Sequence, residues 1–206
     1  MNHYYEQKLL EVASQLTRDV MKSSKSINGG SFLRVRTGWE RRNIENGESI
    51  YEHSCKVALA AYNLIKTQAS LNMGFSHDFP ELIEFDHIPW EINSSEKKRR
   101  ELIAMEALRD ELPNGDYWFD LWSEFEKQQG NAFHIFELDK ICPAIQALEY
   151  MKTYKNNKLE EFYPYSRSKL KTEGLIKILD EMYRIEIPFD VNPYDIYFEK
   201  LSKLKV

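Results

Sequence analysis

Apolar residues recur along most of the chain at intervals of three and four positions, which is the spacing of one face of an α-helix. The first such segment covers residues 3–23, and "KSINGGS" at 25–31 interrupts it because glycine and small polar residues favour turns. No run keeps the strict alternation of a half-buried strand, so the pattern predicts an all-α protein. The apolar face of the first segment consists of Leu9, Leu10, Ala13, Leu16 and Val20.

The middle of the chain is predicted to contain a polar loop followed by two helices. Residues 32–50 are polar and rich in turn formers, which indicates a loop with a short helical piece. A helix is expected from Tyr51 onwards, because its apolar positions form one continuous stripe. Another is expected over "HDFPELIEF" at 77–85, where Pro80 forces either a start or a kink.

Two further helices are predicted between residues 94 and 130. The first begins with Ser94 or Ser95 as its N-cap and ends near Leu112, because Pro113 follows at once. The second is a short amphipathic helix over residues 116–130, which ends in glycine.

A long helix over residues 131–154 and a last helix over 172–186 complete the predicted body of the protein. The aromatic tail, residues 187–206, is expected to dock on that body. The chain is therefore predicted to consist of an N-terminal helical extension with a linker (1–31), one all-α domain (32–186) and the docking tail.

The composition is that of a soluble globular protein and narrows the range of partners. The 206 residues are 42% hydrophobic and 30% charged, and no apolar run reaches the length of a membrane span. The N-terminus lacks the pattern of a secretory signal, and the only cysteines, Cys55 and Cys142, favour free thiols in a reducing cytoplasm. A net charge of −5 disfavours a general nucleic-acid binder, although local cations could still hold a small anion.

Several polar side chains fall where the core of a helical protein would prefer apolar residues. A buried carboxylate is unfavourable unless it is paired or bound to a cation. Two imidazoles with two carboxylates suit a divalent ion such as Mn, Fe, Co, Ni or Zn, whereas an ordinary solvated acidic face is the alternative. The residues concerned are His53, the pair His77–Asp78, Glu81, Asp86 and Asp139.

The spacing of two of these histidines is compatible with a shared ion. His53 and His77 are 24 residues apart in the sequence. A helix of about 11 residues rises about 16 Å, and a tight turn followed by a similar descent returns the chain to its start. An antiparallel helix pair would therefore bring the two imidazoles together, and Asp139 would join them from a third helix.

Four motifs, read in order, resemble those of the HD-domain metal-dependent phosphohydrolases, and among these the 5'-deoxynucleotidase group. They are "RTGW", "YEHS", "SHDFPELIEFD" and "ELDKICPAIQALEY", and the resemblance covers about residues 32–184. It implies an all-α HD-domain helical bundle with an extra N-terminal helix and a C-terminal aromatic tail. The segment between the two histidines is shorter than in that pattern, so the first two helices should be trimmed at their far end.

The resemblance also implies roles for individual residues. His53, His77, Asp78 and Asp139 would ligate one divalent metal ion, for which Co, Mn, Mg, Fe, Ni and Zn all remain open. Glu81, one turn after His77, would be the general acid/base. His87 and His134 raise the question of a second metal, but the further histidines of a dinuclear site are not found at the expected places.

Substrate contacts are implied in the same way. Asp86 would meet the 3'-hydroxyl side of the ribose, Trp39 would shape the sugar pocket and Arg36 would hold phosphate. The other arginines that could hold phosphate instead are Arg34, Arg41 and Arg42.

The expected activity is the release of phosphate from nucleotides by metal-activated water, above all from 5'-deoxynucleoside monophosphates. Two alternatives remain. The same site could act on nucleoside di- or triphosphates, including a modified nucleotide, or the protein could be a degenerate HD protein that binds nucleotide without turnover. The composition indicates a cytoplasmic protein with no membrane or nucleic-acid partner, and the resemblance further implies a homodimer.

Overall fold

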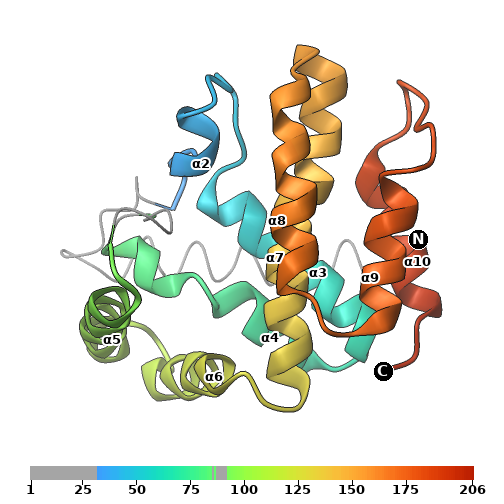
Figure 1. The fold of residues 1–206 in the computed structure, drawn as a ribbon. Coiled ribbons are helices and arrows are strands. Elements are labelled where there is room, and N and C mark those ends of the chain that lie inside the picture. Colours follow the sequence, from blue (N-terminus) through green and yellow to red (C-terminus); the bar gives the residue numbers. More distant parts are fainter. Residues whose placement is uncertain (1–31, 85, 87–91) are drawn as a thin grey trace. The chain divides into compact units, whose positions relative to one another are not determined.

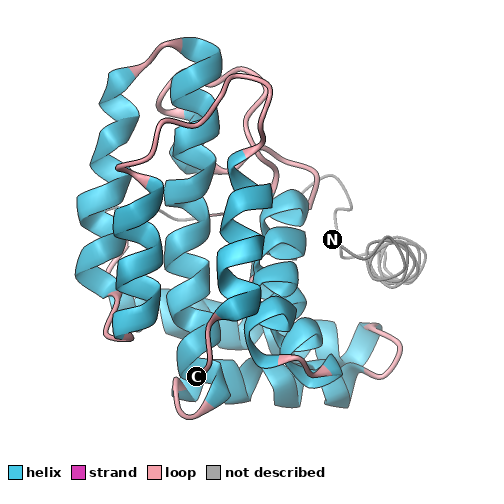
Figure 2. Cartoon of the chain, turned by 90° about the vertical axis from the view of Figure 1, so that its right-hand side faces the viewer, coloured by secondary structure: helices cyan, strands magenta, loops and turns pink. Residues whose placement is uncertain are grey.

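The computed structural model describes residues 32–84, 86 and 92–206, and all elements in this part of the chain are helical (Figure 1). The predicted helix over residues 3–23 lies outside the described residues. Within them, extended pairing is limited to an isolated bridge between Val35 and Ser49, and Figure 2 shows no strand. The predicted all-α fold is confirmed. No helix in the described ranges is long and apolar enough to cross a bilayer.

The chain divides into two compact units. Unit 1 contains the described residues up to Cys55 together with Phe75–Glu124, and unit 2 contains Lys56–Gly74 together with Phe125–Val206. Three helices contribute residues to both units, namely α3 (Ile50–Ile65), α4 (Gln68–Ser76) and α6 (Gly115–Lys127).

The core of unit 1 is aromatic. Phe32 packs edge-on against Tyr51, with ring centroids 5.4 Å apart, and against Phe75 and Phe79 at 6.1 and 6.3 Å. Phe79 in turn contacts Trp118 of α6 at 5.5 Å. This cluster packs residues near 32, 75 and 118 against one another, although they are distant in the sequence. The other elements of unit 1 are α2 (Thr37–Glu40), the 3₁₀ turn η1 (Phe79–Leu82) and α5 (Ser94–Glu111), which packs on η1.

The prediction of a longer helix over residues 77–85 is wrong for the described residues up to 84, whereas the predicted helix start at Pro80 is confirmed. The chain reaches this segment through α4, which ends at Ser76, and then forms only the single 3₁₀ turn η1. Pro80 lies in the first turn of η1, where its missing N–H is tolerated. The helix α4 was expected only from the spacing of His53 and His77, because serine, asparagine and glycine have low helix propensity and interrupt its apolar pattern.

The predicted N-cap of α5 is also wrong. The N-cap is Asn93, whose side-chain Oδ1 accepts the N–H of Glu96 at 2.9 Å. Ser95 instead donates its hydroxyl to the same Oδ1 at 2.9 Å. Asparagine and serine are almost equally good N-caps, so the choice between neighbours depended on the backbone conformation that Asn93 adopts.

Unit 2 is organised around α7 (Asn131–Tyr154), which matches the predicted long helix over residues 131–154. Its buried face includes Ile135, Leu138, Ile141 and Ile145. The elements that pack on α7 are η2 (Asn157–Glu161), α8 (Phe162–Lys169), α9 (Glu173–Met182) and α10 (Pro193–Lys203).

The helix α7 runs through Pro143, which lacks the N–H that would bond to the carbonyl of Asp139. Two tyrosine hydroxyls donate to carbonyls on either side of this proline. Tyr194 of α10 bonds to the carbonyl of Cys142, and Tyr183 bonds to that of Ala144, both at 2.8 Å. The part of the chain that follows residue 182 is thus anchored directly to α7.

Candidate metal and active site

The first turn of α3 is held by a capping box directly before His53. The N–H of Glu52 donates to Ser49 Oγ at 3.2 Å, while the Glu52 carboxylate accepts from the N–H and the hydroxyl of Ser49, both at 2.8 Å. The S-x-x-E pattern for this cap is visible in the sequence at 49–52. It fixes the helix start, from which the fully buried His53 projects.

The α3–α4 hairpin returns the chain to His77. Only Lys66, in the left-handed conformation (φ 64°), and one further residue connect the two helices. Gly74 of α4 lies so near α3 that a Cβ there would be 2.9 Å from Ala58 Cα. The rings of His53 and His77 consequently lie with their centroids 5.4 Å apart, and the predicted antiparallel return is confirmed.

Asp78 completes a group of three donors within unit 1. Its Oδ2 lies 3.2 Å from His77 Nε2 and 3.7 Å from His53 Nε2. This oxygen is buried and makes no hydrogen bond within the described residues. Burial acts to raise the pKa of Asp78, but the interactions with His77, His53 and Arg36 outweigh it and hold the pKa well below its usual range. An ionised carboxylate oxygen facing two imidazole nitrogens is a donor set that fits a divalent metal ion.

Glu81 lies one turn further, in η1, and its environment raises its pKa instead of lowering it. Its side chain is buried, with an exposed fraction of 4%, and its Oε2 makes no hydrogen bond within the described ranges. Burial raises the pKa of Glu81 well above its usual value, and the nearby carboxylates of Asp78 and Asp86 add to this effect. Glu81 can therefore keep a proton at a pH where a surface glutamate has lost it.

The predicted sugar-side residues lie on and around α2. Asp86 Oδ2 accepts the N–H of Thr37, the first residue of α2, at 2.7 Å. Trp39 is buried, and its indole N–H donates to Glu48 Oε2 at 3.3 Å. A Cβ on Gly47 would come within 2.7 Å of Trp39 Cβ, so glycine is needed there for the tryptophan to pack.

Among the arginines of this segment, Arg36 interacts with the acidic cluster, which raises its pKa. Burial acts to lower the pKa of Arg36, but Asp86, Asp78, Glu48 and Glu81 together raise it. Arg42 donates from Nη1 to the carbonyl of Gly38 at 2.7 Å. Arg34 and Arg41 are exposed.

Asp139 belongs to unit 2. It lies on α7 with an exposed fraction of 7%, and its Oδ2 accepts from the ammonium of Lys140 at 2.6 Å. His134, on the same helix, lies 3.5 Å from Glu137, whose carboxylate accepts the N–H of Thr172 at 2.8 Å just before α9. His134 therefore contacts the Glu137 carboxylate, which accepts a hydrogen bond from the residue before α9. His87, the other histidine considered for a second metal, lies outside the described residues.

Two buried or half-buried charged residues near the site were not predicted. Glu48 has an exposed fraction of 2% and contacts both Trp39 and His53. Lys97 of α5 pairs with Glu101 at 3.3 Å, and although burial acts to lower its pKa, the carboxylates led by Glu81 raise it. Both residues stand in polar stretches, where nothing in the sequence pattern marks them as buried.

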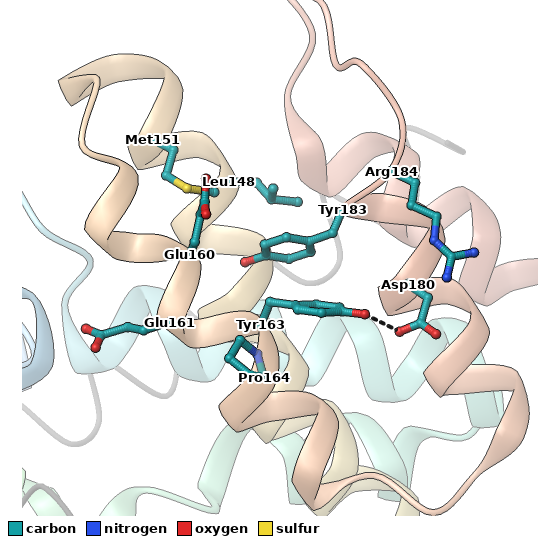
Figure 3. A pocket seen from close by; sticks show the side chains of 9 residues that line it. All are labelled: Leu148, Met151, Glu160, Glu161, Tyr163, Pro164, Asp180, Tyr183 and Arg184. Atoms are coloured by element: carbon teal, nitrogen blue, oxygen red, sulfur yellow. Dashed lines mark hydrogen bonds between the residues drawn. The ribbon is translucent and has the colours of Figure 1, made fainter.

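A separate cavity of about 700 Å³ lies within unit 2 (Figure 3). The rings of Tyr163 and Tyr183 lie 4.7 Å apart in it, and the hydroxyl of Tyr163 donates to Asp180 at 2.9 Å. Asp180 also accepts from Arg167 at 2.8 Å. The lining of this cavity contains none of the predicted site residues. The candidate chemistry therefore rests on the cluster in unit 1.

Comparison with known families places the chain in one of them. The sequence profile of the family described as "HD domain" matches residues 33–178, which is more than half of the chain. The chain therefore belongs to the HD domain family.

Curated relatives carry a more specific name. The chain is 32% identical to 5'-deoxynucleotidase HDDC2 of Xenopus laevis over 164 residues, which cover 75% of this chain and 82% of the relative. The proteins of the same name from Danio rerio and Homo sapiens are 32% and 29% identical, covering 74% of this chain in both cases and 82% and 80% of the relatives. The predicted resemblance to HD-domain phosphohydrolases of the 5'-deoxynucleotidase group is confirmed.

Proposed function

We propose that this chain is a metal-dependent phosphohydrolase that converts 5'-deoxynucleoside monophosphates to deoxynucleosides and orthophosphate. The observation that carries the proposal is the convergence of His53, His77 and Asp78 in unit 1, with Glu81 one turn away. The substrate class is supported by the relatives named 5'-deoxynucleotidase.

The proposed ligands of one divalent ion are His53, His77, Asp78 and Asp139. The first three face one another within unit 1. For Asp139 the support is a buried carboxylate on α7 within a motif that resembles the family pattern. When bound, the ion would lower the pKa of a coordinated water and offset the charge of the phosphate. Its identity among Co, Mn, Mg, Fe, Ni and Zn is a matter for metal analysis.

Glu81 is the proposed general acid/base. During attack on phosphorus it accepts a proton from the water molecule, and it returns that proton to the 5'-oxygen as the bond from phosphorus to this oxygen breaks. Its raised pKa suits both halves of this transfer. The ionised carboxylate is a stronger base than an ordinary one, and the protonated carboxyl is still present as an acid nearer neutral pH. Since one carboxyl both takes and returns the proton, no other proton carrier is required.

Substrate binding is assigned to α2 and its surroundings. Arg36 is proposed to stabilise charge on the phosphoryl oxygens, because a guanidinium binds phosphate through two parallel N–H groups. Asp86 gives one oxygen to Thr37 and can accept the 3'-hydroxyl of the sugar with the other. Trp39 is proposed to form the wall of the sugar pocket, with Arg42 supporting the backbone of α2 through Gly38.

The decisive experiment measures which products are released from which nucleotide. We expect orthophosphate from dAMP with at least one divalent ion, and faster release from dAMP than from AMP. Pyrophosphate or triphosphate from dATP would instead favour the alternative substrates. Nucleotide binding without release, with every metal tested, would favour the degenerate HD protein.

We also propose an assembly and a location for this protein. A homodimer and a cytoplasmic location follow from the family resemblance and from the composition of the chain. Sedimentation equilibrium of the full chain would test the dimer, for which a mass near twice 24.5 kDa is expected.

A further inference from the structure

Glu48 lies among three groups that the proposed function uses. Its carboxylate Oε2 accepts the indole N–H of Trp39 at 3.3 Å and lies 3.8 Å from His53 Nδ1. Its backbone carbonyl accepts the N–H of Arg36 at 3.0 Å. A buried carboxylate with these neighbours is not explained by the packing of an apolar core, since a charged group in a core is unfavourable without a partner.

The two sides of the His53 ring face two different carboxylates. Nε2 faces Asp78 at 3.7 Å, and Nδ1 faces Glu48 at 3.8 Å. A distance of 3.8 Å is an electrostatic contact rather than a hydrogen bond. A negative charge on that side still favours the tautomer with its proton on Nδ1, which leaves the lone pair of Nε2 directed toward Asp78. Histidines that bind metals commonly have their second nitrogen held by a carboxylate in this way.

The backbone around Glu48 is fixed on both sides. Ser49 forms the bridge with Val35 and also the capping box of α3. Gly47 provides the space that the neighbouring Trp39 occupies, because a Cβ there would lie 2.7 Å from Trp39 Cβ. The Glu48 carboxylate is therefore held at a defined point between the α2 segment and the start of α3.

We propose that Glu48 is a positioning residue that orients His53 for metal binding and Trp39 for the sugar pocket with the same carboxylate oxygen. The roles of His53 and Trp39 rest on the proposed function, whereas the contacts of Glu48 do not. Two consequences follow. Metal affinity depends on Glu48 although it is not a ligand, and the KM for nucleotide depends on it through Trp39.

The test compares Glu48→Gln with Glu45→Gln in the full chain. Both substitutions replace one carboxylate by an amide, but Glu45 is an exposed residue of the same loop and serves as the matched control. We expect the Mn²⁺ affinity of Glu48→Gln, measured by calorimetric titration, to fall about 10–100-fold, as is typical when the carboxylate behind a metal-binding histidine is lost. Glu45→Gln should bind Mn²⁺ as the wild type does.

An unchanged Mn²⁺ affinity in folded Glu48→Gln overturns this inference and leaves the proposed function intact. A wild-type chain that binds no Mn²⁺, Co²⁺ or Zn²⁺ overturns the proposed function and this inference with it. Glu48→Asp, which keeps the charge but shortens its reach, decides the matter if the amide variant does not fold. We expect Glu48→Asp to weaken Mn²⁺ binding as well, and wild-type affinity in it would contradict the inference.

A second variant separates the two contacts of Glu48. Trp39→Phe removes the indole N–H but leaves Glu48 beside His53, so it should raise the KM for dAMP several-fold with little change in Mn²⁺ affinity. A purely structural role for Glu48 would lower the melting temperature of Glu48→Gln without altering the Mn²⁺ affinity of the folded molecules. That result would overturn the proposal.

Discussion

At the scale of the residue, two carboxylates three positions apart are driven to opposite protonation behaviour. Asp78 faces two imidazoles, which hold its pKa low, whereas Glu81 is buried beside like charges, which raises its pKa. Titratable pairs whose environments separate their pKa values are typical of sites in which one group stays charged and the other transfers protons. This difference in pKa supports the proposal that Asp78 is a metal ligand and that Glu81 is the general acid/base.

The first prediction concerns Glu81→Gln. The amide keeps the size of the side chain but cannot exchange a proton, so kcat for phosphate release from dAMP should fall about 10²–10⁴-fold. Mn²⁺ affinity should stay near that of the wild type, because Glu81 is not one of the proposed ligands. Steady-state kinetics and calorimetry on the same preparation check both statements. A near-normal kcat would show that another group handles the proton.

At the scale of the element, the α3–α4 hairpin determines how closely the two histidines approach. The capping box sets the start of α3, and the close contact of Gly74 with Ala58 sets the distance between the two helices. Gly74 stands only three positions before His77, so a small change in the spacing of the two helices is transmitted directly to His77. The geometry of the site therefore depends on a glycine that makes no contact with substrate in the proposed mechanism.

We accordingly predict that Gly74→Ala destabilises the protein and weakens metal binding. The new Cβ would lie 2.9 Å from Ala58 Cα, which is backbone and cannot move aside freely. Overpacking of this kind costs about 1–3 kcal/mol, and the better helix propensity of alanine offsets about 0.5–1 kcal/mol of it. Chemical denaturation gives the free energy of unfolding, and titration with Mn²⁺ gives the affinity.

The control for this variant is Ala69→Val on the exposed side of α4. It adds more volume than Gly74→Ala, but the new methyl groups meet solvent. The free energy of unfolding should therefore fall by less than about 0.7 kcal/mol, as expected from helix propensity alone. Equal losses in the two variants would show that the close approach of α3 and α4 is not the limiting contact.

Prediction from the sequence succeeded for elements with a long, regular period and failed where a single local interaction decided the outcome. The helix over residues 131–154 was predicted at both ends because its apolar positions repeat over many turns. The 3₁₀ turn η1 was predicted as a longer helix because the apolar pattern does not show that the turn ends at Leu82, two residues after Pro80. The helices α8 and α10 were not predicted, since both are short and the buried face of α10 consists mainly of aromatic residues, from which only a docking tail was expected.

At the scale of the whole molecule, the proposed ligands come from two compact units. His53, His77 and Asp78 belong to unit 1, and Asp139 belongs to unit 2. If Asp139 is the fourth ligand, the ion should bind the native chain and not the unfolded one, and it should therefore stabilise the folded protein. Ligand binding to the native state alone stabilises it by about 2.7 kcal/mol when the ligand concentration is one hundred times its Kd.

This argument predicts that Mn²⁺ raises the melting temperature of the wild type and that a chelator reverses the change. Asp139→Asn should lose most of the increase, because an amide is a weaker ligand than a carboxylate. Differential scanning calorimetry with and without Mn²⁺ provides the measurement. An undiminished increase in Asp139→Asn would remove Asp139 from the ligand set and leave the three donors of unit 1.

The order of the motifs and the chemical types of the side chains were readable in the sequence, because histidine, aspartate and arginine carry their chemistry wherever they stand. The apolar period predicted the all-α fold, the residue spacing paired His53 with His77, and the order of the motifs nominated Arg36 among four arginines. The tertiary structure alone decided which carboxylate is held ionised and which is driven toward its protonated form, and it alone brought Glu48 into the site. The physical reason is that burial and charge interactions act through space, so their strength depends on distances that residue spacing along the chain does not contain.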